Sequence, residues 1–232
     1  MKDEKKEIAI RCRGIKKSYG QNEIRVEALK GIDLDIFSNQ LTILEGPSGS
    51  GKSTLLSIIT TILTPDAGSL QLLGKEMLHI SQEARARFCR NNIGIVFQSL
   101  FLIPTISVVD NVTLPLLVGG MKQKEAVEKS METLKKMKME QRANVSPASL
   151  SKGQQQKVAI ARAIVNESRI LVCDEPTSSL DQNSGHDTME ILKGLSKESS
   201  VLVVTHDHRI FSFADRIISI NDGLITSGNT HE

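Results

Sequence analysis

A glycine-rich stretch is the part of this 232-residue sequence with the clearest potential for chemistry. The letters GPSGSGKST follow an apolar run, precede a helical one and fit the phosphate-binding pattern GxxxxGKS. Glycine lets successive backbone N–H groups point inward around a phosphate, where a β-carbon would obstruct the wrap. We therefore predict a nucleotide site formed by Gly46, Pro47, Ser48, Gly49, Ser50, Gly51, Lys52, Ser53 and Thr54.

Two side chains of this stretch have specific expected tasks. Lys52 should reach the β- and γ-phosphates of ATP, and the Ser53 hydroxyl should ligate Mg2+. The helix that begins near Lys52 adds the positive end of its dipole. The pattern predicts ATP and Mg2+ as ligands, and by itself it indicates binding and no particular reaction.

Two adjacent carboxylates end an apolar run in RILVCDEP. Ligands of open α/β sheets lie at the carboxyl ends of strands, and neighbouring strand residues point in opposite directions. We assign Asp174 to the metal and Glu175 to the attacking water as general base. An acidic turn at a strand end is the ordinary alternative, which the upstream loop disfavours. Cys173 is interpreted as core packing.

A second helix start also favours anions. Ser151 and Gly153 precede the strongly helical stretch QQQKVAIARAIV, which predicts a capped helix N-terminus with exposed N–H groups. The chain therefore has two segments that favour phosphate, and they lie about a hundred residues apart.

The elements that must position these residues indicate an α/β fold. Apolar and polar residues alternate over roughly residues 1–40, with turn signals at Gly20 and Asn22, which predicts an antiparallel β part. Residues 100–165 have leucines and charges at helical spacing, which predicts a helical subdomain. In the remainder, strands separated by helices predict a mostly parallel sheet covered on both faces. In the helix after the glycine-rich loop, one face should comprise Leu55, Ile58, Ile59 and Ile62.

Length, charge and cysteines limit the class of protein. We expect residues 1–232 to form one domain. The formal net charge of +2 gives no electrostatic reason to expect nucleic acid as a partner. The widely spaced Cys12, Cys89 and Cys173 form no CxxC pair and fit a reducing cytosol. No signal-like segment begins the sequence and no apolar run approaches the roughly 20 residues of a membrane helix, so we expect a soluble chain.

The stretch LSKGQQQKVAIARA, residues 150–163, resembles the LSGGQ signature of ABC ATPases. The remaining elements of that family occur in order along nearly the whole chain, as Tyr19, Gln98, Ser179 to Asp181 and His206. The resemblance implies the ABC ATPase fold, which has a P-loop NTPase core with a mostly parallel sheet, an N-terminal antiparallel β subdomain and an α-helical insert. It also implies ATP hydrolysis.

The resemblance gives further residues a role. Tyr19 looks like the aromatic that stacks on adenine, with a strand-packing tyrosine as the alternative. Gln98 looks like the glutamine that contacts Mg2+ and water, and otherwise would be a polar loop residue. His206 looks like the histidine that holds the γ-phosphate and pairs with Glu175, and a structural histidine is its alternative. Asp181 looks like the aspartate that couples two sites.

Two charged residues beside His206 have no such counterpart. Asp207 and His208 match no family role and are interpreted as solvated loop residues.

The resemblance also implies a head-to-tail homodimer. In that arrangement Ser151, Gly153 and Gln154 of one chain close over ATP held by the glycine-rich loop of the other. The sequence departs from the family at Lys152, where glycine is usual. The retained Ser151 and Gly153 imply that function survives this change.

Three stretches indicate a branch of the family: VEALKGIDLDI, FQSLFLIPTISVVDNVTLPLL and the triple glutamine after the signature. They resemble the branch that contains the macrolide exporter MacB, the lipoprotein-release protein LolD and the division protein FtsE. The resemblance implies a peripheral ATPase on the cytoplasmic side of the inner membrane that powers a separate integral membrane permease of exporter or mechanotransmission type. The alternative is an FtsE-like regulatory cassette. The apolar residues from Leu102 to Leu117 are expected to receive the partner's coupling helix, and core packing is the other use of such residues.

Overall fold

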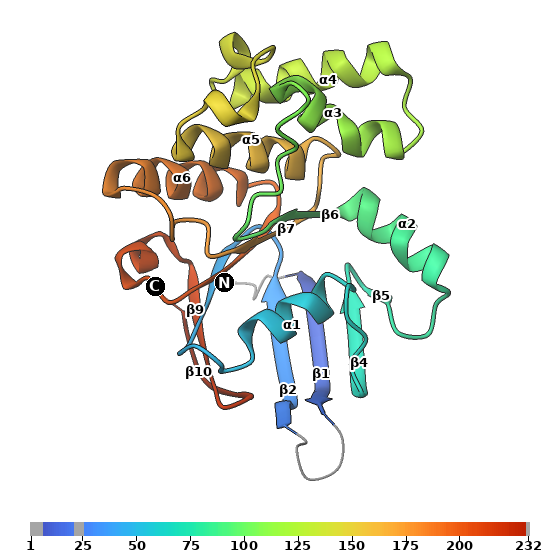
Figure 1. Cartoon of the computed structure of the whole chain (residues 1–232). Coiled ribbons are helices and arrows are strands. Elements are labelled where there is room, and N and C mark those ends of the chain that lie inside the picture. The colour runs from blue at the N-terminus through green and yellow to red at the C-terminus, as the bar shows by residue number, and fades with distance from the viewer. Residues whose placement is uncertain (1–6, 21–25, 231–232) are drawn as a thin grey trace, which may run out of the picture.

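The alternating N-terminal residues form an antiparallel sheet, as Figure 1 shows. The computed structural model describes residues 7–20 and 26–230, with side chains to residue 226. In this sheet β1 (Ile8–Tyr19) pairs with β2 (Val26–Phe37) and β4 (Ala67–Leu72), and β5 (Lys75–Glu76) lies at the edge. The sheet thus includes strands well beyond the expected boundary near residue 40. The turn signal at Asn22 lies outside the described residues.

A second sheet of six strands carries the predicted mostly parallel topology. Its order is β10-β9-β3-β8-β7-β6, and only the β9/β10 pair is antiparallel. The strands are β3 (Leu41–Glu45), β6 (Ile93–Val96), β7 (Ile170–Asp174), β8 (Ser200–Thr205), β9 (Arg216–Asn221) and β10 (Leu224–Thr230). The prediction of an α/β fold with a mostly parallel sheet is therefore confirmed.

Helices cover this sheet on one face and gather above it in Figure 1. The helices of that side are α3 (Val108–Val118), α4 (Gln123–Lys136), α5 (Lys152–Ile164) and α6 (Gln182–Leu195). Short 3-10 helices occur at Glu140–Arg142, Pro147–Ser149 and His208–Phe213. The opposite face packs on α1 (Lys52–Ile59) and the antiparallel sheet, and α2 (Gln82–Asn92) leads into β6.

Strand periodicity divides the interior into two cores. Along β7, Leu171 and Cys173 belong to the core with α3 to α6, whereas Ile170 and Val172 belong to the core with α1. The same alternation directs Asp174, the last residue of β7, to the α1 side. Cys173 is fully buried, and burial raises the pKa of its thiol, which fits a packing role.

The helix after the glycine-rich loop is shorter than expected. It ends at Ile59, and Ile62 is 63% exposed, so the expectation that Ile62 shares the buried face is wrong. The Thr60 hydroxyl donates to the Leu56 carbonyl, and Thr61 has a left-handed φ of 60°. These two threonines turn the chain before the helical pattern is complete.

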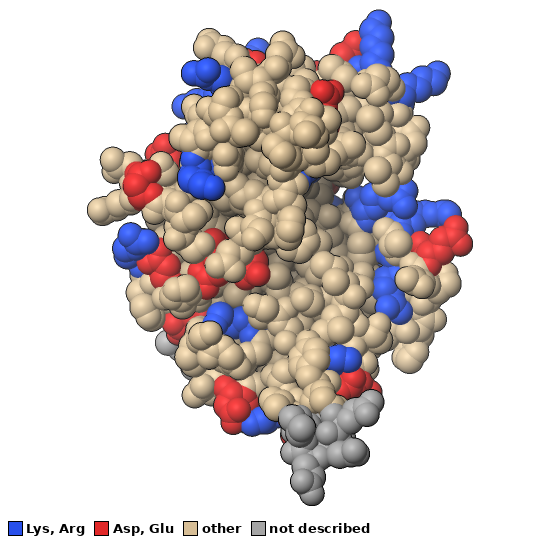
Figure 2. Space-filling view, in the orientation of Figure 1, with Lys and Arg blue, Asp and Glu red and all other residues tan. Residues whose placement is uncertain are grey.

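Charges of both signs lie over the surface. On the face in Figure 2, Lys and Arg side chains gather beside α2, at the right, and elsewhere basic and acidic groups are mixed. Among the helices of residues 7–20 and 26–230, none combines the length and the apolar character that crossing a membrane requires.

Candidate active site

The glycine-rich loop packs too tightly for side chains at two of its glycines. A β-carbon on Gly46 would lie 2.2 Å from the Ile220 carbonyl oxygen, and one on Gly51 would lie 2.6 Å from that of Ala28. Gly51 also has a φ of 103°, which L-residues with a side chain rarely adopt. The loop thus needs glycine at both positions, as its sequence predicts.

Lys52 opens α1 and folds back over the loop. Its Nζ donates to the carbonyls of Gly46 and Pro47, at 2.7 and 2.8 Å. Burial lowers the pKa of Lys52, and the nearby carboxylates of Glu175 and Asp174 act in the opposite direction. The ammonium therefore lies inside the loop, facing the two carboxylates that end β7.

Asp174 and Glu175 differ in backbone and surroundings. Asp174 is half-buried, and its pKa is raised by burial and by the neighbouring charge of Glu175. Glu175 follows the strand with a left-handed φ of 49°, a conformation that costs about 1–3 kcal/mol. Its backbone is held by an N–H donated to the Val204 carbonyl and by Ser178, whose hydroxyl donates to the Glu175 carbonyl.

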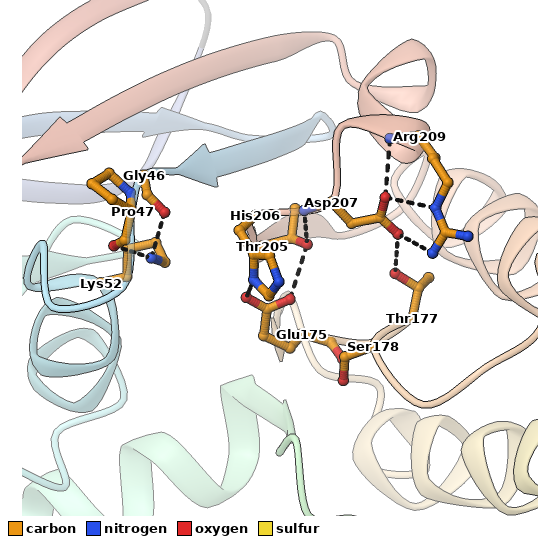
Figure 3. A network of polar contacts seen from close by, with 10 residues as sticks. All are labelled: Gly46, Pro47, Lys52, Glu175, Thr177, Ser178, Thr205, His206, Asp207 and Arg209. Carbon is orange, nitrogen blue, oxygen red and sulfur yellow. Dashed lines mark hydrogen bonds and ion pairs between the residues drawn. The ribbon is translucent and has the colours of Figure 1, made fainter.

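His206 lies against Glu175, as Figure 3 shows. The distance from His206 Nδ1 to Glu175 Oε1 is 2.6 Å. A carboxylate oxygen accepts in such a contact, so Nδ1 is the donor toward Glu175 and Nε2 faces away from it. The imidazole is 70% exposed while the carboxylate is 10% exposed, so the histidine covers the acid from the solvent side.

A cavity of about 550 Å³ brings most of the predicted side chains together. It is lined by Lys52 and Ser53, by Gln98 and His206, and by both carboxylates. Ser53, Gln98 and Asp174 contribute oxygen atoms, which are the donors that Mg2+ prefers. Together with the tight glycine loop, this donor set fits a nucleotide with its divalent cation.

Tyr19 is not among the residues that line this cavity. The ring is 46% exposed at the end of β1, and its hydroxyl is 3.4 Å from the Thr54 hydroxyl. Its exposure disfavours the alternative of a strand-packing tyrosine.

The signature residues lie away from this cavity and cap helices. Ser151 caps α5 in a reciprocal capping box with Gln154, and a β-carbon on Gly153 would lie 3.0 Å from the Ser184 hydroxyl. Asp181 caps α6 and accepts from the N–H groups of Asn183 and Ser184. Among the described residues that line the nucleotide cavity, Ser151, Gly153, Gln154 and Asp181 of the same chain do not occur.

The expectation that Asp207 is solvated is wrong, because its carboxylate is only 15% exposed. It accepts a bidentate pair from Arg209 at 2.8 Å, the Arg209 N–H, and the Thr177 hydroxyl at 3.3 Å. The hydrogen bond from Arg209 is the largest influence that lowers the pKa of Asp207. The basic residue two positions later is the sequence signal that predicts such pairing. His208 is 79% exposed, consistent with a loop residue.

Fold and site together define a P-loop nucleotide-binding protein, with a glycine-rich loop before α1 and a carboxylate pair at the carboxyl end of β7. Residues 29–178 match the family described as ABC transporter. The chain belongs to this family, and it is an ABC ATPase.

Similar proteins agree with this assignment. The macrolide export ATP-binding/permease protein MacB of Shigella flexneri is 36% identical over 93% of this chain and 34% of its own length. The corresponding protein of Brucella melitensis is 39% identical over 95% of this chain and 34% of its own. The chain thus spans about a third of the length of these relatives.

Solved structures share the fold over nearly the whole chain. The dimeric structure of MJ0796, a bacterial ABC transporter cassette, has a TM-score of 0.87 and 36% identity, and the match covers 95% of this chain and 98% of that one. The same cassette in a dimeric post-hydrolysis state bound to ADP and Pi also has a TM-score of 0.87.

Proposed function

We propose that this chain is the ATPase cassette of an exporter or mechanotransmission type transporter, and that the residues of its cavity have the roles their positions favour. The observation that carries the proposal is the Glu175–His206 pair, which faces the lysine-bearing loop across one cavity. Lys52 and the loop amides hold the phosphates. Glu175 accepts a proton from the attacking water, and His206 orients Glu175 through Nδ1.

Three residues of the cavity would hold the cation. Ser53, Gln98 and Asp174 would hold Mg2+, which when bound neutralises phosphate charge. The position of Asp174 on the α1 side of β7, beside the loop, suits it to that task. Glu175, which departs from strand geometry, is left free for proton transfer.

Two phosphate-binding segments on one chain favour a head-to-tail dimer. The capped N-terminus of α5 presents the N–H groups that follow Ser151, yet it lies outside the chain's own nucleotide cavity. A second copy would bring that helix start over the nucleotide. Tyr19 would then stack on the adenine and Asp181 would link the two sites.

Lys152 gives a test of this arrangement. It is exposed at the first position of α5, where a positive charge opposes the helix dipole and no acidic residue lies in the first turn. We expect Lys152→Gly to raise the KM for MgATP several-fold at low salt, because the lysine adds attraction for phosphate. The difference should shrink at high salt, where the Debye length falls to about 3 Å at 1 M.

Lys152→Arg is the matched control for that measurement, because it keeps the charge. Identical ATPase kinetics of Lys152→Gly and the parent across salt concentrations would contradict a role for this charge.

A groove beside the cavity suits a membrane partner. Gln98 borders both the nucleotide cavity and a second hollow of about 430 Å³ whose walls include Leu100, Phe101, Leu102 and Pro104. The Arg162 guanidinium holds this segment by donating to the carbonyls of Leu100 and Phe101. Gln98 is thus placed to respond to the nucleotide on one side and to a docked segment on the other.

The residues that line this groove are fewer than the predicted docking range, Leu102 to Leu117. The α3 part of that range is largely core, with Val108, Val112 and Leu116 buried. Exposed apolar residues lie before it, with Phe101 66% and Ile103 40% exposed, and at its last position, Val118, which does not line the hollow. We therefore assign docking to residues 98–104, and the packing alternative applies to α3.

The membrane partner lies outside these 232 residues, on the same polypeptide or another. A photo-crosslinking residue at Phe101 in the native host should join the chain to an integral membrane segment. The same probe at Leu224, exposed on the opposite edge strand β10, is the control. Equal labelling at both positions, or crosslinks only to non-membrane proteins, would contradict this assignment and the cytoplasmic membrane location that follows from it.

A further inference from the structure

The hydroxyl of Thr205 contacts the second oxygen of Glu175. Thr205 is the last residue of β8 and is fully buried. Its Oγ1 lies 3.0 Å from Glu175 Oε2, while His206 Nδ1 occupies Oε1 of the same carboxylate (Figure 3). Both oxygens of the proposed base therefore have a protein donor, one from each of two successive residues.

The direction of the Thr205 hydrogen bond is fixed by its other partner. The backbone N–H of Asp207 donates to Thr205 Oγ1 at 3.0 Å. A hydroxyl has one proton and two acceptor lone pairs, and a backbone N–H can only donate. The single Thr205 proton is therefore left for Glu175 Oε2. The hydroxyl group is thus oriented before any substrate arrives.

The Asp207 N–H is itself held in place. The Asp207 cluster, formed by Thr177, Asp207 and Arg209, joins the segment after β7 to the segment after β8. Asp207 also caps the 3-10 helix His208–Phe213 through the Arg209 N–H. The cluster thus links the segment that follows Glu175 to the segment that follows Thr205.

Glu175 needs such support because its own backbone is unfavourable. A left-handed glutamate is held only when its surroundings over-determine it, and its flexible side chain has several rotamers to lose. Hydrogen bonds to both carboxylate oxygens limit the rotamers that this side chain can adopt. A displacement of about 1 Å at a catalytic group can cost about 10²-fold in rate.

We propose that Thr205 is a positioning residue for Glu175, and that the Asp207 cluster holds Thr205 in turn. Thr205 touches neither nucleotide nor water in this role; it acts through the carboxylate. The inference rests on the proposed function, since it takes Glu175 as the general base.

The experiment compares Thr205→Val with Thr205→Ser in the full chain. Valine keeps the shape and removes both the donor to Glu175 and the acceptor of the Asp207 N–H, whereas serine keeps the hydroxyl that makes both hydrogen bonds. We expect Thr205→Val to lower the kcat of ATP hydrolysis about tenfold and to leave the KM for MgATP within about twofold, because Thr205 does not line the nucleotide cavity and acts on the reaction only through Glu175. Thr205→Ser should recover most of the kcat.

Thr42→Val is the matched control. Thr42 is fully buried on β3, the strand that pairs with β8, and among the described residues its hydroxyl has no hydrogen-bond partner. We expect parental kcat from this variant. Unfolding temperatures show which variants are folded, and if valine prevents folding, Thr205→Ala replaces it as the variant without the hydroxyl, with the same expected fall in kcat and the same comparison with serine.

Several results would overturn the proposal: a parental kcat in Thr205→Val, an equal loss in Thr205→Ser, or a fall in MgATP affinity that matches the fall in kcat. Glu175→Gln, measured alongside, separates failure of the proposed function from failure of the Thr205 inference. Full turnover in that variant would remove the proposed base, whereas a dead Glu175→Gln with a normal Thr205→Val would remove this inference alone.

Discussion

Glu175→Gln is expected to hydrolyse ATP about 10²- to 10⁴-fold more slowly than the parent, the usual contribution of general acid–base catalysis. The amide keeps the size of the side chain and loses the ability to accept a proton. MgATP affinity should be preserved, because the loop around Lys52 is unchanged. Phosphate release and equilibrium nucleotide titration measure the two quantities separately.

Glu190→Gln on α6 is the control for this variant, since Glu190 is exposed and outside the cavity. Turnover of Glu175→Gln at the parental rate would mean that another group activates the water. A loss of MgATP binding in step with activity would assign Glu175 to ligand binding instead of proton transfer.

Gly51→Ala should weaken MgATP binding by about 10²-fold or more. A β-carbon there meets the Ala28 carbonyl at 2.6 Å and Leu29 Cδ2 at 2.9 Å, in a residue whose φ is 103°. The backbone contact cannot be relieved by a rotamer change, so the loop must move and lose its amide geometry. Strain of about 3 kcal/mol corresponds to roughly two decades in affinity. Calorimetric titration with MgATP provides the measurement.

Gly74→Ala separates backbone strain from the clash. Gly74 has a φ of 76°, a β-carbon there would meet no atom of the described residues within 4 Å, and it does not line the nucleotide cavity. We expect Gly74→Ala to lose about 1 kcal/mol of stability and to bind MgATP as the parent does. If Gly51→Ala also retained parental affinity, the loop would not be the phosphate site.

The parts of the site that could be read from the sequence are those made by short continuous segments. The glycine-rich loop carries its ligands within nine residues, from Gly46 to Thr54, and strand periodicity separates Asp174 from its neighbour without any knowledge of the fold. The family resemblance then added His206 beside Glu175, and their 2.6 Å contact matches that implication.

The parts that could not be read depend on contacts distant in the chain or on unusual backbone. The left-handed Glu175 has no signature, because glutamate rarely adopts that conformation. Thr205 and Glu175 are thirty positions apart and meet only because β7 and β8 are neighbours. Ile62 fits a helical pattern that its preceding threonines interrupt.

Head-to-tail dimerisation around MgATP is the central claim, since the two phosphate-binding segments of one chain do not meet. Sedimentation of Glu175→Gln protein with MgATP tests it most directly, because blocked hydrolysis should preserve the closed state. We expect a monomer without nucleotide and a dimer with MgATP. A protein that binds MgATP and still sediments as a monomer, even with its membrane partner supplied, would contradict this claim.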